Sequence, residues 1–171
     1  AWAALMQARA SEPPTVTRLH AGDGRLIAEY AKERRVFVPI AAMPRRVKQA
    51  FIAAEDQNFY SHYGVDFVAL ARAVVTNVVK YAQGRRPVGA STVTQQVAKN
   101  FLLSNEVSIE RKIKEAILAF RIERTLSKDR ILELYLNEIY LGYGSYGVAA
   151  AALNYFNKSM DELTTAEVAY L

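Results

Sequence analysis

The chain has 171 residues, of which 51% are hydrophobic and 23% charged, so its composition fits one globular domain and argues against a disordered chain. It has no cysteine and two histidines, which argues against disulfides, thiolate chemistry and a zinc hydrolase of the H-E-x-x-H type. Its 22 Lys and Arg outnumber its 17 Asp and Glu. This excess of positive charge suits an anionic partner such as nucleic acid, a phosphorylated substrate or an acidic membrane.

The N-terminal residues are predicted to precede the main domain. No run of about 18 apolar residues occurs, so no segment of this sequence is expected to span a bilayer. Residues 1–14 are interpreted as a juncture or linker that follows a membrane anchor outside this sequence. Within a linker segment at 15–43, alternation around Asp23-Gly24 predicts a β-hairpin with strands near 15–20 and 25–30.

From Pro44 onward the hydrophobic pattern is helical. A first helix is predicted to end near Glu55, with an apolar face at Val47, Phe51 and Ala54. A second helix is expected to start after the N-cap Asp66 and to reach about Tyr81. Its apolar face is predicted to consist of Phe67, Leu70, Val74, Val75, Val78 and Val79.

Two more helices follow a basic loop that is broken by Gly and Pro. Ser91 is predicted to cap the helix TVTQQVAKNFLL. The next helix should run from about Ser108 to about Leu126 and bury the stripe Ile109, Ile113, Ile117 and Phe120.

The remaining residues are predicted to form further short helices. Ser127 is expected to cap a helix that reaches about Leu141. The segment VAAAALNYF is predicted to be a helix closed by Asn157, and Thr164 with Glu167 forms a T-x-x-E capping box. Because that box announces a helix cut off at Leu171, we expect a mainly helical domain over 44–171 that is truncated at its C-terminus.

Glu55 and Asp56 stand at a helix end, where acidic residues face the negative pole of the helix dipole. Carboxylates placed there beside an apolar segment are candidates for a raised pKa and for general-base chemistry. The alternative is that either one accepts hydrogen bonds from the amides of the following loop. His62, taken by itself, is favoured as a hydrogen-bonded structural imidazole.

Two other polar clusters accompany these acids. At a helix start, hydroxyls and free N–H groups can cradle phosphate oxygens, although an ordinary cap explains the same residues: Ser91, Thr92, Thr94, Gln95 and Gln96. Farther on, Arg111, Lys112 and Glu115 lie beside Ala116 and Ala119, whose small side chains allow a close approach. The alternative there is a solvated face with an Arg111–Glu115 pair. Together, the carboxylates, cations and helix start suit the displacement of a phosphate leaving group.

Four ordered motifs within residues 55–137 resemble those of the peptidoglycan glycosyltransferases, glycosyltransferase family 51. The pattern E-D-x-x-F-x-x-H-x-G is matched by Glu55, Asp56, Phe59, His62 and Gly64. The pattern G-x-S-T-x-T-Q-Q is matched by Gly89, Ser91, Thr92, Thr94, Gln95 and Gln96. The pattern R-K-x-x-E is matched by Arg111, Lys112 and Glu115. The pattern K-x-x-I-L-E-x-Y-L-N is matched by Lys128, Ile131, Leu132, Glu133, Tyr135, Leu136 and Asn137.

A fifth region of the family, near Tyr155-Phe156, matches loosely. Relatives often have an acidic residue at the position of Ala149 and a glycine at that of Asn157, so no role is transferred there. The resemblance implies the lysozyme-like domain of class A penicillin-binding proteins and monofunctional transglycosylases. The hairpin segment favours the class A proteins.

The resemblance also implies a reaction, the polymerisation of lipid II into β-1,4 glycan strands. The 4-hydroxyl of an acceptor GlcNAc attacks C1 of the donor MurNAc, with inversion and release of undecaprenyl diphosphate. Glu55 would be the general base, and Glu115 would act on the donor side with Arg111 and Lys112, which would hold the diphosphate.

Other residues would bind or support in this scheme. Ser91, Thr92, Gln95 and Gln96 would bind donor phosphate and sugar, and Lys128 and Asn137 would shape the site. The supporting residues would be Asp56, Phe59, His62, Gly64 and Gly89.

The resemblance places the chain in the bacterial cell envelope, on the periplasmic or extracellular face of the inner membrane. Its partners would be lipid II, the growing glycan strand, the outer leaflet and a transpeptidase domain beyond Leu171. No serine here begins an S-x-x-K motif, so this chain itself is not a transpeptidase. No tightly bound cofactor is expected, although Mg²⁺ or Mn²⁺ can accompany the diphosphate, and the sequence shows no dedicated ligand set.

Electrostatics adds an expectation about the position of Glu55. A salt bridge to Arg111 or Lys112 would lower the pKa of Glu55 and weaken it as a base. We therefore expect Glu55 to stand apart from both cations, in a cleft with the substrate between.

Two alternatives remain open. One is a lysozyme-like muramidase or lytic transglycosylase, in which Glu55 is a general acid that cleaves glycan; it leaves the second and third motifs without a purpose. The other is a non-catalytic basic helical module that binds nucleic acid, which predicts salt-dependent DNA binding.

Overall fold

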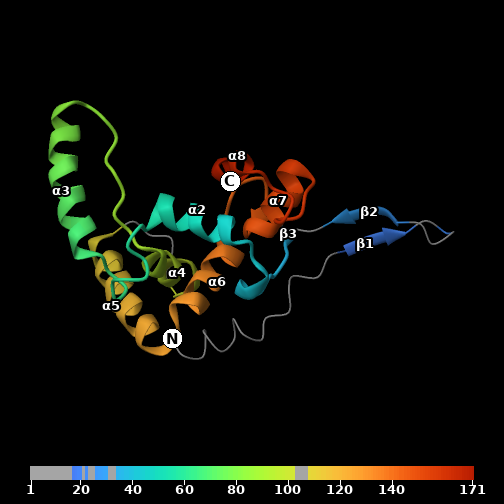
Figure 1. Cartoon of the computed structure of the whole chain (residues 1–171), viewed down its shortest axis with the longest axis horizontal. Helices are drawn as coiled ribbons and strands as arrows, with labels where there is room; N and C mark the ends of the chain where they lie inside the picture. The colour runs from blue at the N-terminus through green and yellow to red at the C-terminus, as the bar shows by residue number, and fades with distance from the viewer. Residues whose placement is uncertain (1–16, 21, 23–25, 31–33, 103–107) are drawn as a thin grey trace. The chain divides into compact units, whose positions relative to one another are not determined.

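The computed structural model describes residues 17–20, 22, 26–30, 34–102 and 108–171. The chain divides into two compact units, which we call unit 1 (residues 1–44 with 136–171) and unit 2 (residues 45–135). In the described ranges, seven α-helices, α2 to α8, accompany one 3-10 helix and four short strands (Figure 1). The prediction of a mainly helical fold is confirmed.

Unit 1 contains all the described strands. Strand β1 (Thr17–His20) pairs antiparallel with β2 (Leu26–Tyr30), while the turn Asp23-Gly24 and the linker 1–14 lie outside the described residues. The short strand β3 (Arg34–Arg35) pairs in parallel with β4 (Ser145–Tyr146).

The chain after β3 is tied to the end of helix α6 (Lys128–Glu138). The side chain of Asn137 accepts a hydrogen bond from the Val38 N–H at 2.8 Å and donates one to the Val38 carbonyl at 2.9 Å. These two bonds satisfy both backbone groups of one residue, as a neighbouring strand would. They are followed by the 3-10 helix η1 (Ile40–Ala42).

Of the last two helices of unit 1, α7 begins and ends and α8 begins where the sequence predicts, while the predicted truncation stays a prediction. Helix α7 (Val148–Phe156) is closed by Asn157, which has the left-handed conformation with φ 52° and ψ 40°. Helix α8 (Thr165–Tyr170) starts with the capping box of Thr164 and Glu167, in which both reciprocal hydrogen bonds are present. The Thr164 and Glu167 side chains, and at the end of α7 the Asn157 backbone N–H, satisfy backbone groups that the helices leave unpaired.

Unit 2 holds α2 (Arg45–Glu55), α3 (Phe67–Ala82), α4 (Val93–Leu102), α5 (Ile109–Thr125) and most of α6. Three of the predicted helix starts are confirmed, because the side chains of Asp66, Ser108 and Ser127 accept hydrogen bonds from N–H groups in the first turns. Helix α6 ends at Glu138, three residues before the predicted Leu141.

The predicted cap of α4 is wrong by one residue. Thr92 caps the helix instead of Ser91: its Oγ1 accepts from the Gln95 N–H at 3.2 Å, and the Gln95 side chain accepts from the Thr92 N–H at 3.0 Å. This reciprocal pair is a capping box, which requires a Gln or Glu three residues after the cap. Thr92 has Gln95 at that spacing, whereas Ser91 has Thr94.

The predicted buried face of α5 is also wrong. The stripe is exposed, from 38% at Phe120 to 83% at Ile109, and the buried residues of the helix are Glu115, Ala119 and Ile122. Periodicity identifies residues that share a face, but it does not say which face another element covers. Here the ion-paired Glu115 and the small Ala119 face the protein.

The predicted buried face of α3 is exposed as well. Its only buried residue is Ala73, and all six residues of its predicted apolar face are exposed. In unit 2 the far end of α3 extends away from the other helices (Figure 1). Phe67 of α3 stacks on Phe120 of α5 with ring centroids 6.4 Å apart, so the two exposed stripes meet. We call these residues together the apolar surface: Phe67, Leu70, Val74, Val75, Val78, Val79, Ile113, Ile117 and Phe120.

Helix α2 follows its predicted pattern in part. Val47 and Phe51 are buried, whereas Ala54 is exposed. Among the described helices, none is both long and apolar enough to cross a bilayer.

Candidate active site

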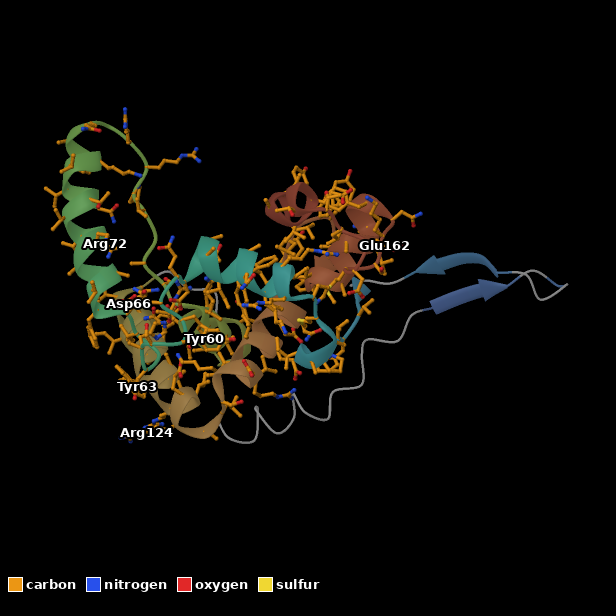
Figure 2. The ribbon with its side chains drawn as sticks, in the orientation of Figure 1. Tyr60, Tyr63, Asp66, Arg72, Arg124 and Glu162 are labelled. Carbon is orange, nitrogen blue, oxygen red and sulfur yellow. The ribbon has the colours of Figure 1, made fainter. Side chains whose placement is uncertain are left out.

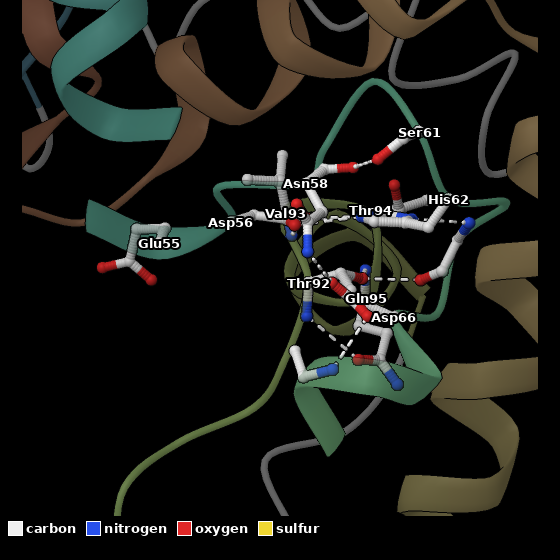
Figure 3. A network of polar contacts seen from close by, with 12 residues as sticks. Glu55, Asp56, Asn58, Ser61, His62, Asp66, Thr92, Val93, Thr94 and Gln95 are labelled. Carbon is white, nitrogen blue, oxygen red and sulfur yellow. Dashed lines mark hydrogen bonds and ion pairs between the residues drawn. The ribbon is translucent and has the colours of Figure 1, made fainter. Parts of the chain in front are cut away.

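Glu55 is the last residue of α2, and its side chain is exposed. Its Oε2 accepts a hydrogen bond from the Gln96 side-chain amide at 2.8 Å. Figure 3 shows the carboxylate pointing away from the neighbouring network around Asp56. Within the described ranges no ion pair involves Glu55. The motif cations Arg111 and Lys112 both pair with Glu115 instead. As predicted, Glu55 forms no described ion pair with either cation, while the cleft between them stays a prediction.

Asp56 and His62 form a buried pair behind Glu55. The His62 Nε2 lies 2.9 and 3.0 Å from the two carboxylate oxygens of Asp56, and the His62 Nδ1 accepts from the Gly64 N–H at 3.1 Å. Because Nδ1 accepts, the proton of the neutral ring is on Nε2, where it is donated to Asp56. The interpretation of His62 as a structural imidazole fits these contacts.

Asp56 also fixes the start of α4. Its Oδ2 accepts from the Val93 N–H at 3.0 Å, and the Thr92 hydroxyl donates to the Gly64 carbonyl at 2.6 Å (Figure 3). Thr92 and Gln95 are buried. Since the N–H groups of Val93 and Gln95 are bonded to protein side chains, they do not form the free phosphate cradle that the sequence suggests.

Gly64 and Ala119 bring the loop before α3 into direct contact with α5. Gly64 has φ +92°, and a Cβ at this position would lie 2.8 Å from the Ala119 carbonyl carbon. Only glycine fits both the conformation and the space. The close approach that the small Ala119 allows is thus made by Gly64, a residue of the same chain. Gly89, by contrast, has no heavy atom within 4 Å of its Cβ position.

Asp66 connects this loop to α3 and is labelled in Figure 2 at the start of the helix. Its carboxylate accepts from the Ala69 N–H at 2.9 Å and from the Asn58 side-chain amide at 2.9 Å. These two hydrogen bonds, the backbone one first, lower the pKa of Asp66.

Glu115 is buried with two cations. Its side chain is 2% exposed, and its two oxygens lie 3.2 Å from the Arg111 Nε and 2.7 Å from the Lys112 Nζ. The Arg111 contact lacks hydrogen-bond alignment. Lys112 is half-exposed and also donates to the Ser91 hydroxyl at 2.7 Å. The Arg111–Glu115 pair that the alternative interpretation named is present, but Glu115 is buried and holds the two cations from the protein side, so this helix face is not simply solvated.

Another carboxylate, Glu123, whose side chain is 5% exposed, was missed by the sequence analysis. Glu123 accepts from the Thr94 hydroxyl at 2.6 Å and from the Lys128 Nζ at 2.7 Å, and that Nζ lies 4.5 Å from the centre of the Phe59 ring. This chain of contacts joins the first, second and fourth motifs. The signal was present in the spacing, since positions 115, 119 and 123 lie four apart on one face of α5.

Two residues of the fourth motif, the predicted site residue Asn137 and Tyr135, have different surroundings. Asn137 belongs to unit 1, where its side chain bonds Val38. Tyr135 is 1% exposed, and its hydroxyl has no hydrogen-bond partner among the described residues. Burial, and then the charge of Glu55, raise the pKa of Tyr135 well above the ordinary value for a phenol.

Comparisons with known proteins place the chain in a class. The transglycosylase family model matches residues 23–171, and the chain belongs to that family. Its relatives include penicillin-binding protein 1A of Rickettsia felis, which is 60% identical over 159 residues, or 93% of this chain and 20% of that protein. Penicillin-binding protein 1A of Neisseria flavescens is 52% identical over 160 residues, or 94% of this chain and 20% of that protein.

The chain thus spans about a fifth of the length of these curated relatives. A crystal structure of penicillin-binding protein 1A from Haemophilus influenzae aligns with a TM-score of 0.45 and 28% identity, over 92% of this chain and 14% of that one. The family resemblance inferred from the four motifs is confirmed by the family model and the curated relatives.

Proposed function

We propose that this domain polymerises lipid II into glycan strands and releases undecaprenyl diphosphate with inversion at C1 of the donor. Membership of the transglycosylase family and similarity to penicillin-binding proteins 1A support peptidoglycan glycosyltransferase activity. The finer assignments below rest on the surroundings of the individual side chains.

Glu55 is the general base, and the observation that carries this role is its exposed carboxylate without a described ion pair. A carboxylate paired with a cation loses basicity, whereas this one keeps only the neutral Gln96 amide on Oε2. Its other oxygen can take the proton from the acceptor 4-hydroxyl. In an inverting displacement the attacking and leaving groups lie on opposite sides of the reacting carbon, which agrees with a base separated from the diphosphate-binding cations.

The donor side is assigned to Lys112, Arg111 and Ser91. The half-exposed Lys112 next to the Ser91 hydroxyl offers a cation and a hydroxyl to an anionic oxygen. Glu115 is too buried to receive a sugar, so its role is to hold both cations in place. Developing charge on the departing diphosphate is stabilised by groups that are already oriented.

The remaining motif residues position this machinery. Gln96 orients Glu55, and the buried contacts described above fix the start of α4 and the loop before α3. In this group we place Thr92, Gln95, Asp56, His62, Gly64, Phe59 and Lys128. Asn137 and Gly89 are not placed in this group: Asn137 bonds Val38, and Gly89 has no heavy atom within 4 Å of its Cβ position.

No metal step is part of this proposal. The described residues contain no group of three His, Asp or Glu side chains that could hold a metal ion, and Glu115 is already engaged with two cations. A divalent cation would therefore have to bind mainly through the diphosphate of the substrate.

The membrane is the expected location, because lipid II carries a long hydrocarbon chain. The apolar surface on α3 and α5 offers exposed side chains that can enter the outer leaflet next to the substrate. Anchoring by a segment before this sequence, and a transpeptidase domain after it, belong to the same proposal.

The test is incubation of the full-length protein with labelled lipid II. Glu55→Gln keeps the size and the Gln96 contact site but removes the base, so glycan polymer should fall by at least about a hundredfold. Glu110→Gln is a matched control, since Glu110 is an exposed acid of α5 that pairs with Lys114. Polymer from Glu55→Gln at the wild-type rate would refute the base, and cleavage of finished glycan without lipid II would favour a muramidase.

A further inference from the structure

The hydroxyl of Tyr135 is a buried polar group without a described use. Its side chain is 1% exposed, and the oxygen has no hydrogen-bond partner within the described ranges. Burying an unpaired hydroxyl is unfavourable, and phenylalanine would fill nearly the same space without that cost. Because native proteins rarely bury an unpaired polar atom, the Tyr135 hydroxyl is a candidate for a role in the site.

The position of the ring brings Tyr135 next to the turn of α2 that carries Glu55. Tyr135 packs edge-on against Phe51, with ring centroids 6.3 Å apart and planes at 72°. Phe51 lies four residues before Glu55, one helical turn away on the same side of α2. Burial, and after it the charge of Glu55, raise the pKa of the Tyr135 hydroxyl, so that it stays protonated and remains a hydrogen-bond donor.

Among the described residues, the Glu55 carboxylate accepts one hydrogen bond, on Oε2. From α4 the neutral Gln96 amide donates to Oε2. The α5 cations Arg111 and Lys112 are held by Glu115. From α6, the Tyr135 ring packs on Phe51 one turn before Glu55, and the charge of Glu55 adds to burial in raising the Tyr135 pKa.

We propose that Tyr135 is a positioning residue for Glu55, and that its buried hydroxyl donates a hydrogen bond to the Glu55 carboxylate when the acceptor sugar covers the site. This rests on the proposed role of Glu55 as the base. Covering the site removes water, so a donor inside the protein becomes the available partner for the carboxylate. Two donors, Gln96 and Tyr135, then fix the direction in which the remaining lone pair meets the acceptor hydroxyl.

The experiment compares Tyr135→Phe with the wild-type full-length protein in lipid II polymerisation. Loss of a hydrogen bond to a charged group should lower kcat by about 10-fold to 100-fold and leave KM for lipid II within about twofold. Because a lost donor raises the pKa of the carboxylate, the acidic limb of the kcat profile should move to higher pH. The melting temperature should stay unchanged or rise, since no described partner is lost.

Tyr60→Phe is the matched control. It removes a phenol hydroxyl that donates to Asp129 at 3.0 Å, and it should leave the acidic limb where it is. A Tyr135→Phe protein with kcat within twofold of wild type and an unmoved acidic limb would overturn the proposal. A large drop in melting temperature with a parallel loss of activity would also overturn it, in favour of a structural hydroxyl.

The same assay separates this proposal from the function on which it rests. If Glu55→Gln abolishes polymerisation while Tyr135→Phe behaves as wild type, the base stands and the positioning role fails. If the wild-type protein makes no polymer from lipid II, the proposed function itself fails.

Discussion

The start of α4 and the apolar surface lie in the same unit and reverse the usual distribution of side chains. Around the start of α4, Asp56, Thr92 and Gln95 are buried, and each has hydrogen-bond partners in α4, in the loop before α3 or among one another. On the apolar surface, large aliphatic and aromatic side chains face outward. Polar groups can form an interior when their partners are complete, and a stripe of exposed apolar side chains can serve as a contact surface.

The largest expected effect tests which face of α5 is the interior. Ile122→Lys places a charge at a residue that is 3% exposed, and it should lower the free energy of unfolding by more than about 3 kcal/mol. Ile117→Lys makes the same change at a residue that is 49% exposed, and it should stay within about 0.5 kcal/mol. Urea unfolding of the two proteins measures the difference. Equal losses would mean that the stripe is covered in the folded protein.

A smaller effect tests how tightly the polar region is closed. Gly64→Ala must place a Cβ 2.8 Å from the Ala119 backbone at a φ of +92°, so a loss of about 2 to 4 kcal/mol is expected. Gly89→Ala meets no atom within 4 Å, and it should change stability by less than about 0.5 kcal/mol. Thermal melts of both variants provide the measurement, and a stable Gly64→Ala protein would show that the loop can move away from α5.

The smallest effect concerns Asp66, which joins the two regions by capping α3 from the polar loop. Asp66→Ala should cost about 1 kcal/mol through the lost cap. Because the folded pKa of Asp66 is lowered, its contribution is present above the ordinary value of 3.8 and is lost as pH falls through the folded value.

Asp66→Asn is the control for this titration. Asparagine caps helices about as well as aspartate but carries no titrating group. Unfolding measured from pH 6 down to pH 2 should show a weaker decline in stability for Asp66→Asn than for the wild type. The same decline in both proteins would assign the acid sensitivity to other carboxylates.

Local signals in the sequence predicted much of this fold. The caps at Asp66, Ser108, Ser127 and Thr164 and the left-handed Asn157 follow from residue types that bond the backbone nearby, so no distant contact is needed to foresee them.

Which faces of α3 and α5 are buried could not be predicted from such local signals. Their stripes are periodic, but burial depends on which element covers a face, and local spacing carries no such information. The polarity of Glu115 favoured an outward side chain, whereas its two cations make an inward one tolerable. For the site, the motifs indicated the residues, while Glu123 and the roles of buried groups emerged only from their contacts.

The Asn137 contact with Val38 has a consequence for the order of synthesis on the ribosome. The two residues are 99 positions apart, and translation at roughly 5–20 residues per second separates them by about 5 to 20 s. Unit 2 is continuous in sequence, while unit 1 is made of residues on both sides of it. The first half of unit 1 therefore has to wait, with the Val38 backbone unmatched, until unit 2 has been translated in full.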